Sequence, residues 1–211
     1  MPPRAPTPPA DEPRARLVEA AIEQIEQRGL ARLTIREVAA AAGANIAAVN
    51  YYFGSKDALV SAALEGTIRV MMEDIDEILK SASGSPKQGF AELLEYLIEG
   101  TLRFPRISKA HLHDAFSADD YSGPFPALFA PLLIRVRDAL REALPALSES
   151  AASRRVVAAL SAMFFPGFFA GLFSGMSILE HPRERREYAQ EVARQLLAPV
   201  PKSERTGKRK R

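Results

Sequence analysis

The sequence has no cysteine among its 211 residues, which excludes disulfide bonds and metal sites built on thiolates. A reducing cytoplasm is therefore the compartment that we expect. Segment 1–10 is rich in proline and lacks the apolar core of a secretory signal, so nothing indicates export. The sequence also lacks the Gly-x-Ser-x-Gly elbow and the glycine-rich phosphate loop of common enzyme classes. We accordingly expect no enzymatic activity, no catalytic residue and no cofactor.

Alternation of apolar and polar residues, the pattern of a β-strand, is nearly absent as well. Long stretches instead place apolar residues three and four positions apart, between clusters of Gly, Pro and Ser, which predicts an all-α fold. Hydrophobic residues make up 47% of the chain, enough to build a core. Nine helices are expected, at about residues 13–28, 34–42, 46–52, 55–80, 90–103, 108–118, 125–144, 150–179 and 183–197.

Positive charge is concentrated at the C-terminal end of the sequence. Segment 199–211 has six basic residues and one acid, a balance of +5, while the whole chain carries +2, so the remainder carries −3. The basic balance is therefore no sign of a basic DNA-binding face. The segment either adds nonspecific affinity for phosphate or is simply a solvated, disordered end.

A pair of short helices is expected on either side of a turn at Gly43. Thr34 and Glu37 form a capping box at the start of the first helix. The second helix follows Asn45, and Ser55 is placed to cap the long helix after it. Two short helices that meet at such a turn are typical of a helix-turn-helix, whose second helix enters the major groove of DNA.

The residues of this region closely resemble the N-terminal signature of the TetR/AcrR family of repressors. The resemblance is carried by TIREVA at 34–39 and AGANIAAVNYYFGSKDAL at 42–59, and it covers residues 14–60. The remainder resembles the family only in the number and length of its helices. The resemblance implies a helix-turn-helix domain at 13–60 and a helical ligand-binding and dimerisation domain at 61–198. Composition and charge add a disordered arm at 1–12 and a basic disordered tail at 199–211.

The same resemblance implies a cytoplasmic homodimer that binds a palindromic operator in double-stranded DNA and is released by a small hydrophobic effector. Asn45 is equally well explained as a helix cap, Arg36 as a solvated charge, and Tyr52 as a ring that packs the head. Asn50 stands where tyrosine is commoner in the family, so it reads a base or replaces a phosphate contact. The residues that the resemblance places at DNA are Thr34, Arg36, Asn45, Ala47, Ala48, Asn50, Tyr51, Tyr52 and Lys56.

Charges nearly balance over residues 14–60, with six basic residues against five acids. The affinity for DNA must then depend on how these charges are sorted between the faces of the domain, and on a dimer that doubles the contacts.

Segment 156–179 has 24 residues without a charge. Its length fits a membrane span, and a helical membrane-associated protein is the alternative function. Pro166 and Gly167 at its centre favour a buried helix that is kinked near Ala162 and meets a second subunit. Three glycines four residues apart would then form a ridge for close helix approach. The expected dimer interface is Met163, Gly167, Gly171, Gly175, Tyr188 and Val192.

Aromatic residues are frequent from residue 90 onward. They form either the core or the walls of an apolar effector pocket. A flat aromatic or fatty-acyl ligand would suit such a pocket, with Arg103, Arg106 or His113 at its polar end. His111 and His113 with Asp114 raise the possibility of a metal site, but residues two apart lie on different sides of a helix, so no metal is expected. The expected pocket residues are Tyr96, Arg103, Phe104, His113, Phe116, Phe129, Leu133, Phe165 and Phe169.

Overall fold

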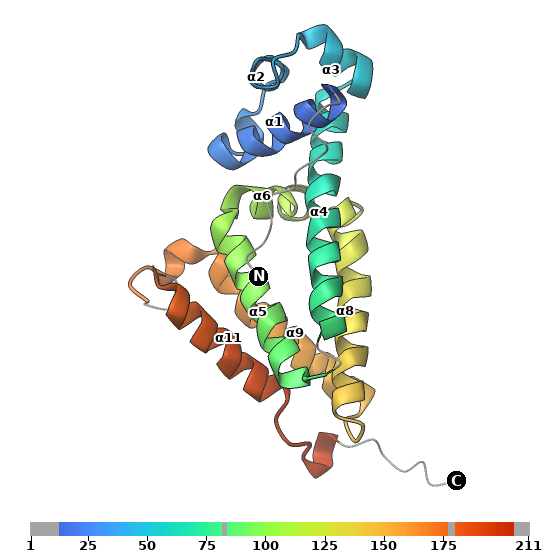
Figure 1. Ribbon diagram of the computed structural model, residues 1–211, viewed down its shortest axis with the longest axis vertical. Helices are drawn as coiled ribbons and strands as arrows, with labels where there is room; N and C mark the ends of the chain where they lie inside the picture. The colour runs from blue at the N-terminus through green and yellow to red at the C-terminus, as the bar shows by residue number, and fades with distance from the viewer. Residues whose placement is uncertain (1–12, 82–83, 177–179, 205–211) are drawn as a thin grey trace, which may run out of the picture. The chain divides into compact units, whose positions relative to one another are not determined.

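The computed structural model describes residues 13–81, 84–176 and 180–204 (Figure 1). Over these residues the regular structure is helical throughout and contains no β-strand, which confirms the all-α class. The expected arm at 1–12 and the last part of the tail, 205–211, lie outside the described residues. The described chain divides into a head unit, residues 13–73 and 104–127, and a body unit, residues 74–103 and 128–204. This division differs from the expected boundary at residue 60, because segment 104–127 packs with the N-terminal helices.

The head unit contains the three expected N-terminal helices. Gly29 ends the first of them with a φ of +85°, and its amide donates to the Ile25 carbonyl at 2.8 Å. The single helix expected at 108–118 is wrong: a turn at residues 111–112 divides it in two. The helices that supply the head unit are α1 (Pro13–Arg28), the 3₁₀ helix η1 (Leu30–Arg32), α2 (Ile35–Ala41), α3 (Ile46–Phe53), the first part of α4 (Lys56–Ser81), α6 (Pro105–Ala110) and α7 (His113–Ala118).

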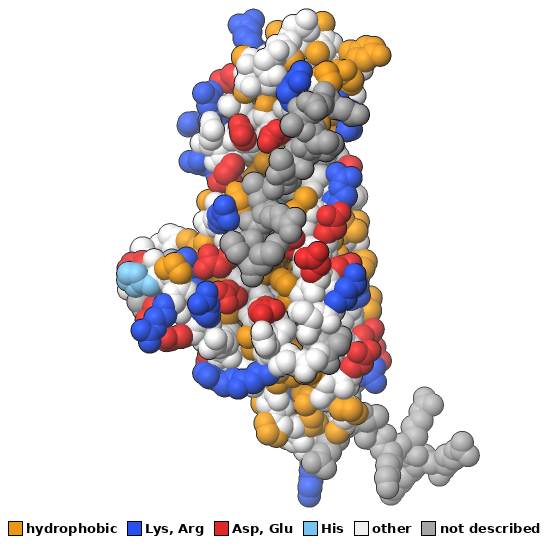
Figure 2. All heavy atoms as spheres, viewed as in Figure 1, with side chains coloured by type: hydrophobic (Ala, Val, Ile, Leu, Met, Phe, Trp, Pro, Cys, Tyr) orange, Lys and Arg blue, Asp and Glu red, His pale blue; other side chains and the backbone are white. Residues whose placement is uncertain are grey.

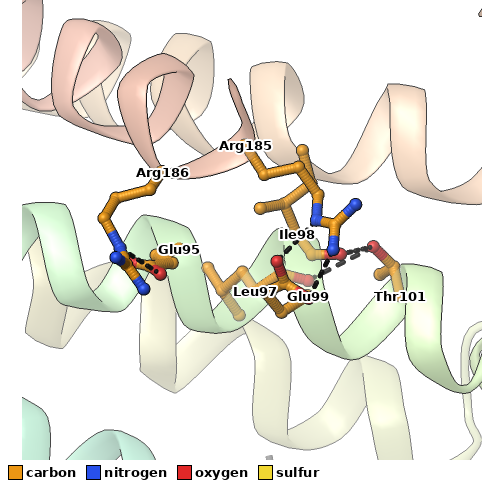
Figure 3. A network of polar contacts seen from close by, with 7 residues as sticks. All are labelled: Glu95, Leu97, Ile98, Glu99, Thr101, Arg185 and Arg186. Carbon is orange, nitrogen blue, oxygen red and sulfur yellow. Dashed lines mark hydrogen bonds and ion pairs between the residues drawn. The ribbon is translucent and has the colours of Figure 1, made fainter. Parts of the chain in front are cut away.

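The body unit is a bundle in which α5 lies against both α9 and α11 (Figure 1). The contact between α5 and α11 includes two ion pairs, Arg185 with Glu99 and Arg186 with Glu95 (Figure 3). The helices that supply this unit are α5 (Pro86–Arg103), most of α8 (Pro124–Ala143), α9 (Glu149–Phe168), the 3₁₀ helix η2 (Ala170–Phe173), α11 (Pro182–Leu196) and the 3₁₀ helix η3 (Lys202–Glu204).

Helix α9 ends at Phe168, so the helix expected at 150–179 is wrong in its second half. Pro166 has no amide to donate and Gly167 is a poor helix former, and Phe169 already leaves helical geometry with φ −115° and ψ 37°. Gly171 and Gly175 therefore lie outside α9, and the expected glycine ridge along one helix does not form. Among the helices of the described residues, none is long and apolar enough to cross a membrane.

Gly167 lies in the tightest contact of the body unit, between α9 and α5. A Cβ atom at this position would come within 2.6 Å of the Thr101 Cβ. Thr101 is itself buried, and its hydroxyl donates to the carbonyls of Ile98 and Leu97 at 2.9 and 3.2 Å (Figure 3). Gly167 is thus required for close packing within one chain, which leaves it no surface for a second subunit.

The first part of the basic tail is folded, contrary to the disorder expected from residue 199. The Ser148 amide donates to the Glu204 carbonyl at 2.8 Å, and Arg155 Nε donates to the Glu204 carboxylate at 2.8 Å. Arg155 also donates to the carbonyls of Leu196 and Ala198 at 3.0 and 2.7 Å. One arginine of α9 therefore fixes the chain from the end of α11 to residue 204.

Substitution Gly167→Ala is expected to destabilise the fold by about 1 to 3 kcal/mol, because α5 and α9 must separate to admit the methyl group. Chemical denaturation measures this change in the free energy of unfolding. Gly171→Ala is the matched control, since no atom lies within 4 Å of a Cβ placed at that residue. Equal effects of the two substitutions would contradict the packing role assigned to Gly167.

Candidate nucleic-acid interface

The expected capping box begins α2. The Glu37 amide donates to Thr34 Oγ1 at 3.3 Å, and the Thr34 hydroxyl donates to the Glu37 carboxylate at 2.7 Å. The hydrogen bond from Thr34, and then the charge of Arg28, which forms an ion pair with Glu37, lower the pKa of Glu37. Thr34 and Glu37 thus fix the start of α2, while Arg36 is exposed beside them.

A tight turn joins α2 to α3. Gly43 has a φ of +63°, a left-handed conformation that favours glycine, and the Ala44 amide donates to the Ala39 carbonyl at 2.8 Å. Asn45 is the N-cap of α3, and its Oδ1 accepts from the Ala48 amide at 2.8 Å. Of the two explanations for Asn45, helix capping is the one that the structure contains.

One face of α3 is exposed and the opposite face is packed into the head core. Ala47, Asn50 and Tyr51 are spaced by three and four residues and are all exposed, Tyr51 to 83%. Val49 is fully buried. Ala48 is half-buried against the same core, so it does not belong to the exposed face.

Two further side chains complete the surface around α3. Ile46, the first residue of the helix, is exposed. It was not among the DNA-contacting residues expected from the sequence, because an isoleucine is typical of a core. Tyr52 is partly exposed and lies edge-on to Tyr51, with ring centroids 5.1 Å apart. We define the recognition face as Ile46, Ala47, Asn50, Tyr51 and Tyr52.

Helix α4 begins immediately after this face. Ser55 is its N-cap, as expected, because its Oγ accepts from the Ala58 amide at 3.1 Å. Lys56, the first residue of α4, is half-buried. A lysine at a helix N-terminus adds its charge to the free amides there, a combination that suits a phosphate group.

The acids of the head unit are partly neutralised by local partners. Glu37 is paired with Arg28, and Glu26 accepts hydrogen bonds from two backbone amides. In contrast, no ion pair holds Arg16, Arg32 or Arg36 within the part of the chain that the structure describes, and all three are exposed. Figure 2 shows basic and acidic side chains intermingled on its visible face, with no continuous basic patch.

Helices α1 and α6 cap each other inside the head unit. The Glu26 carboxylate accepts from the amides of Ile107 and Arg106 at 2.9 and 3.2 Å. The Arg106 guanidinium donates to the carbonyls of Glu26 and Gln27 at 2.9 and 2.6 Å. Arg106 therefore caps α1, and no local sequence signal indicates this pairing of distant segments.

His111 follows α6 and belongs to the same head unit. The Thr67 hydroxyl donates to the Leu64 carbonyl at 2.8 Å, so its oxygen accepts from His111 Nε2 at 2.9 Å. The imidazole stacks on Phe125 with centroids 5.5 Å apart. Burial lowers the pKa of His111 to about 4, so the ring is neutral at pH 7, while His113 is exposed.

The nine residues expected to line an effector pocket are divided between the two units. Phe104, His113 and Phe116 belong to the head unit, and Phe116 is 72% exposed. The body unit contains the other six: Tyr96, Arg103, Phe129, Leu133, Phe165 and Phe169. Phe165 and Phe169 contact each other at the surface, with centroids 5.1 Å apart, whereas Tyr96 is buried.

Most of the residues expected at a dimer interface make contacts within the chain. Met163 and Val192 are buried in the core of the body unit, together with Gly167. Tyr188 donates its hydroxyl proton to the Ala162 carbonyl at 3.0 Å. Of the six, only Gly171 and Gly175 are exposed, and these two follow the end of α9.

Residues 17–63 match the model of a family described as bacterial regulatory proteins, tetR family. The curated relatives include the HTH-type transcriptional regulator BetI of Brucella canis, 33% identical over 81 residues, which are 38% of this chain and 40% of the relative. BetI of Paraburkholderia phytofirmans is 32% identical over 74 residues, 35% of this chain and 38% of the relative. The chain thus spans about two fifths of the length of the curated relatives it matches.

Solved structures extend the likeness over both units. A transcriptional regulator from Rhodococcus sp. RHA1 has a TM-score of 0.63 at 21% identity and covers 87% of this chain and 95% of its own. A TetR-family transcriptional regulator from Streptomyces coelicolor has a TM-score of 0.61 at 22% identity, over 88% and 96%. The multidrug binding protein EbrR, complexed with imidazole, has a TM-score of 0.54 at 25% identity, over 90% and 97%. The chain is therefore similar to the tetR family of bacterial regulatory proteins over residues 17–63, and it shares the fold of these solved structures over both units.

Acidification is expected to destabilise the protein through His111. Its pKa lies at about 4 in the folded chain and near 6.5 in an unfolded chain, so this contribution is complete above pH 6.5 and is lost as the pH falls toward 4. Between pH 6.5 and 5 the free energy of unfolding should fall by roughly 1 to 2 kcal/mol. Denaturation of His111→Gln should depend less on pH, because glutamine keeps a donor for Thr67 and does not titrate. An unchanged pH dependence in this variant would contradict the assignment.

Proposed function

We propose that the chain is a sequence-specific DNA-binding transcription regulator that reads DNA with the recognition face of α3. The observation that carries the proposal is the spacing of Ala47, Asn50 and Tyr51 on one exposed face of the second helix of a helix-turn-helix. The Asn50 amide can bond base edges in the major groove, and the Ala47 methyl can contact a thymine methyl. This face carries no charge, so the electrostatic affinity for DNA must come from the residues around it.

Phosphate contacts are assigned to groups in the helices before and after α3. Lys56, at the N-terminus of α4, follows α3 in the sequence, and the exposed Arg36 of α2 precedes it. The Tyr51 hydroxyl, on a side chain that is almost fully exposed, supplies a further donor. These few contacts per head match a regulator that gains affinity by placing two heads on one operator.

A homodimer is part of the proposal because the body unit exposes an apolar stripe. Val157 and Phe165 are exposed on the outer face of α9, with the exposed polar Ser161 between them at the same four-residue spacing. Leu172 in η2 is exposed as well. A soluble helix seldom leaves such residues in water, so this stripe is the surface that we assign to the second subunit, in place of the buried residues expected from the sequence.

The regulator is proposed to act as a repressor that a small effector releases from DNA. The name of EbrR as a multidrug binding protein supports ligand binding by a chain of this fold. A difference of about 1 to 3 kcal/mol in effector affinity between the DNA-bound and free conformations suffices for a useful response. The mutual capping of α1 and α6 gives segment 104–127 a direct contact with the helix that supports α2 and α3.

The proposed function is tested by a mobility-shift titration of the full chain with the DNA upstream of its own gene. We expect a discrete complex on a palindromic site, with two chains per site, that competing random duplex does not remove. Equal binding to every duplex, or binding to none, would overturn the proposal.

Two substitutions in the head should separate readout of the bases from contact with the phosphates. Lys56→Ala should weaken binding to all sequences alike and reduce the salt dependence by about one phosphate per head. Asn50→Ala should change the preference among operator variants by about 1 to 3 kcal/mol at one base pair of each half-site. Competition binding at several salt concentrations measures both. If Asn50→Ala weakens all sequences equally, Asn50 is a phosphate ligand and the assignment of base readout is wrong.

The dimer surface is tested with Phe165→Glu, which places a charge on the apolar stripe. We expect association to weaken by at least about 2 kcal/mol, as for a central aromatic of an interface. Ile134→Glu is the matched control, because Ile134 is on α8 and is 50% exposed, close to the 52% of Phe165. Sedimentation measures the monomer fraction, and a dimer that persists in Phe165→Glu but not in Ile134→Glu would move the interface to α8.

A further inference from the structure

The segment that contains the turn and α3 has no arginine and no lysine. Between Arg36 and Lys56 the sequence has no basic residue, and Glu37 is its one acid. In the major groove a guanine is most often read by a bidentate arginine or lysine, and a cytosine by a carboxylate that accepts from its amino group. The side chains that read G·C pairs are therefore nearly absent from this segment.

The charged groups next to α3 are engaged or lie away from its start. The Glu37 carboxylate accepts from the Thr34 hydroxyl at 2.7 Å and pairs with Arg28, so it is not free to accept from cytosine. Cζ of Arg14 lies 5.1 Å from the centroid of the Phe53 ring, at the last residue of α3. A helix rises about 1.5 Å per residue, so Phe53 is about 10 Å along the axis from the first turn, which contacts base edges in a helix-turn-helix. This guanidinium is therefore placed for phosphate and not for bases.

The side chains at the start of α3 suit A·T pairs instead. Ile46 and Ala47 occupy its first turn, and both are exposed. Their methyl groups can pack on the C5 methyl of thymine, the one base that carries an apolar group in the major groove. Such a contact would also remove from water the apolar surface of Ile46, which is 42% exposed.

Asn50 is the amide that is free to read adenine. It lies one turn after Ile46 on the same face, it is exposed, and its side chain has no hydrogen-bond partner among the described residues. An amide with both groups free accepts from N6 and donates to N7 of an adenine at once. Asn45, the other asparagine of the segment, uses its Oδ1 to cap α3, so it does not present both groups to a base.

We propose that α3 reads A·T pairs: Asn50 binds an adenine, and Ile46 and Ala47 contact thymine methyl groups. The inference rests on the proposed function, because it names the bases that the regulator contacts in each half-site. No guanine of the operator is contacted by α3.

Selection of bound duplexes from a random library by the full chain identifies the half-site. We expect a palindrome with about two or three adjacent A·T pairs in each half-site, since three side chains supply the contacts. A palindrome whose half-sites consist of G·C pairs would overturn the inference and leave the proposed function intact. Recovery of no common sequence would overturn both.

Deoxyuridine distinguishes contact with a methyl group from a preference for the shape of A·T-rich DNA, because it lacks only the C5 methyl of thymidine. Replacing the thymidines of a half-site one at a time should weaken binding about fourfold at each contacted position, the effect of one buried methyl group. Ile46→Ala should lose this sensitivity at one position. Ile134→Ala, at a similarly exposed isoleucine of α8, is the matched control and should keep it. If no thymidine shows a loss, the preference comes from DNA shape and the inference is wrong.

7-Deazaadenine, which lacks the N7 acceptor, tests the role of Asn50. At one adenine of the half-site it should weaken binding by the unaltered chain at least about fivefold, whereas Asn50→Ala should bind both duplexes alike. The two variants of α3 control for each other, since Ile46→Ala should keep the sensitivity to 7-deazaadenine and Asn50→Ala should keep the sensitivity to deoxyuridine. An equal effect of 7-deazaadenine on Asn50→Ala and on the unaltered chain would refute adenine readout.

Should Asn50→Ala bind too weakly for this comparison, Asn50→Arg decides. An arginine at this position should change the preferred base from adenine to guanine, because it supplies the bidentate donor that the segment lacks. A second selection with this variant measures the change, and a retained preference for adenine would refute the role of Asn50.

Discussion

The head unit depends on the reciprocal cap between α1 and α6. A helix N-terminus has free amides and a C-terminus has free carbonyls, and Glu26 and Arg106 satisfy one set each. The same contact brings Ile107 and Ala110 into the core that holds the helix-turn-helix together. Segment 104–127 is therefore part of the head unit, although the chain passes through α5 of the body unit before it. Any change in this segment acts on α1, and α1 contacts both α2 and α3.

For the proposed function, the nearly neutral charge of the head limits the electrostatic part of DNA binding. Two acids of the head, Glu37 and Glu26, have local partners, and Arg16, Arg32 and Arg36 are exposed. In the proposed function one head gains little free energy from nonspecific DNA, so we expect specificity to come from the uncharged recognition face and affinity from two heads that bind together. The proposed mechanism therefore requires both the apolar stripe on α9 and the recognition face on α3, and we propose that a small effector with a modest coupling energy reverses it.

Local signals predicted the head well, because its helix ends are determined by neighbouring residues. Thr34, Asn45 and Ser55 cap helices within three residues of themselves, and the family resemblance added the direction of the recognition face. Several errors arose where burial and contacts depend on distant partners. The close contact of Gly167 with Thr101 and the folded start of the tail at Arg155 each join residues far apart in the sequence, whereas the end of α9 follows the local Pro166-Gly167 pair.

Contact between residues 34–56 and the operator is the central requirement of the proposed function. Hydrogen–deuterium exchange of the full chain, with and without its operator, measures this contact directly at the level of short peptides. We expect DNA to slow exchange in α2, α3 and the first turn of α4, and random duplex at the same concentration to do so much less. Slower exchange confined to the basic C-terminal segment, with α3 unchanged, would contradict the proposed function.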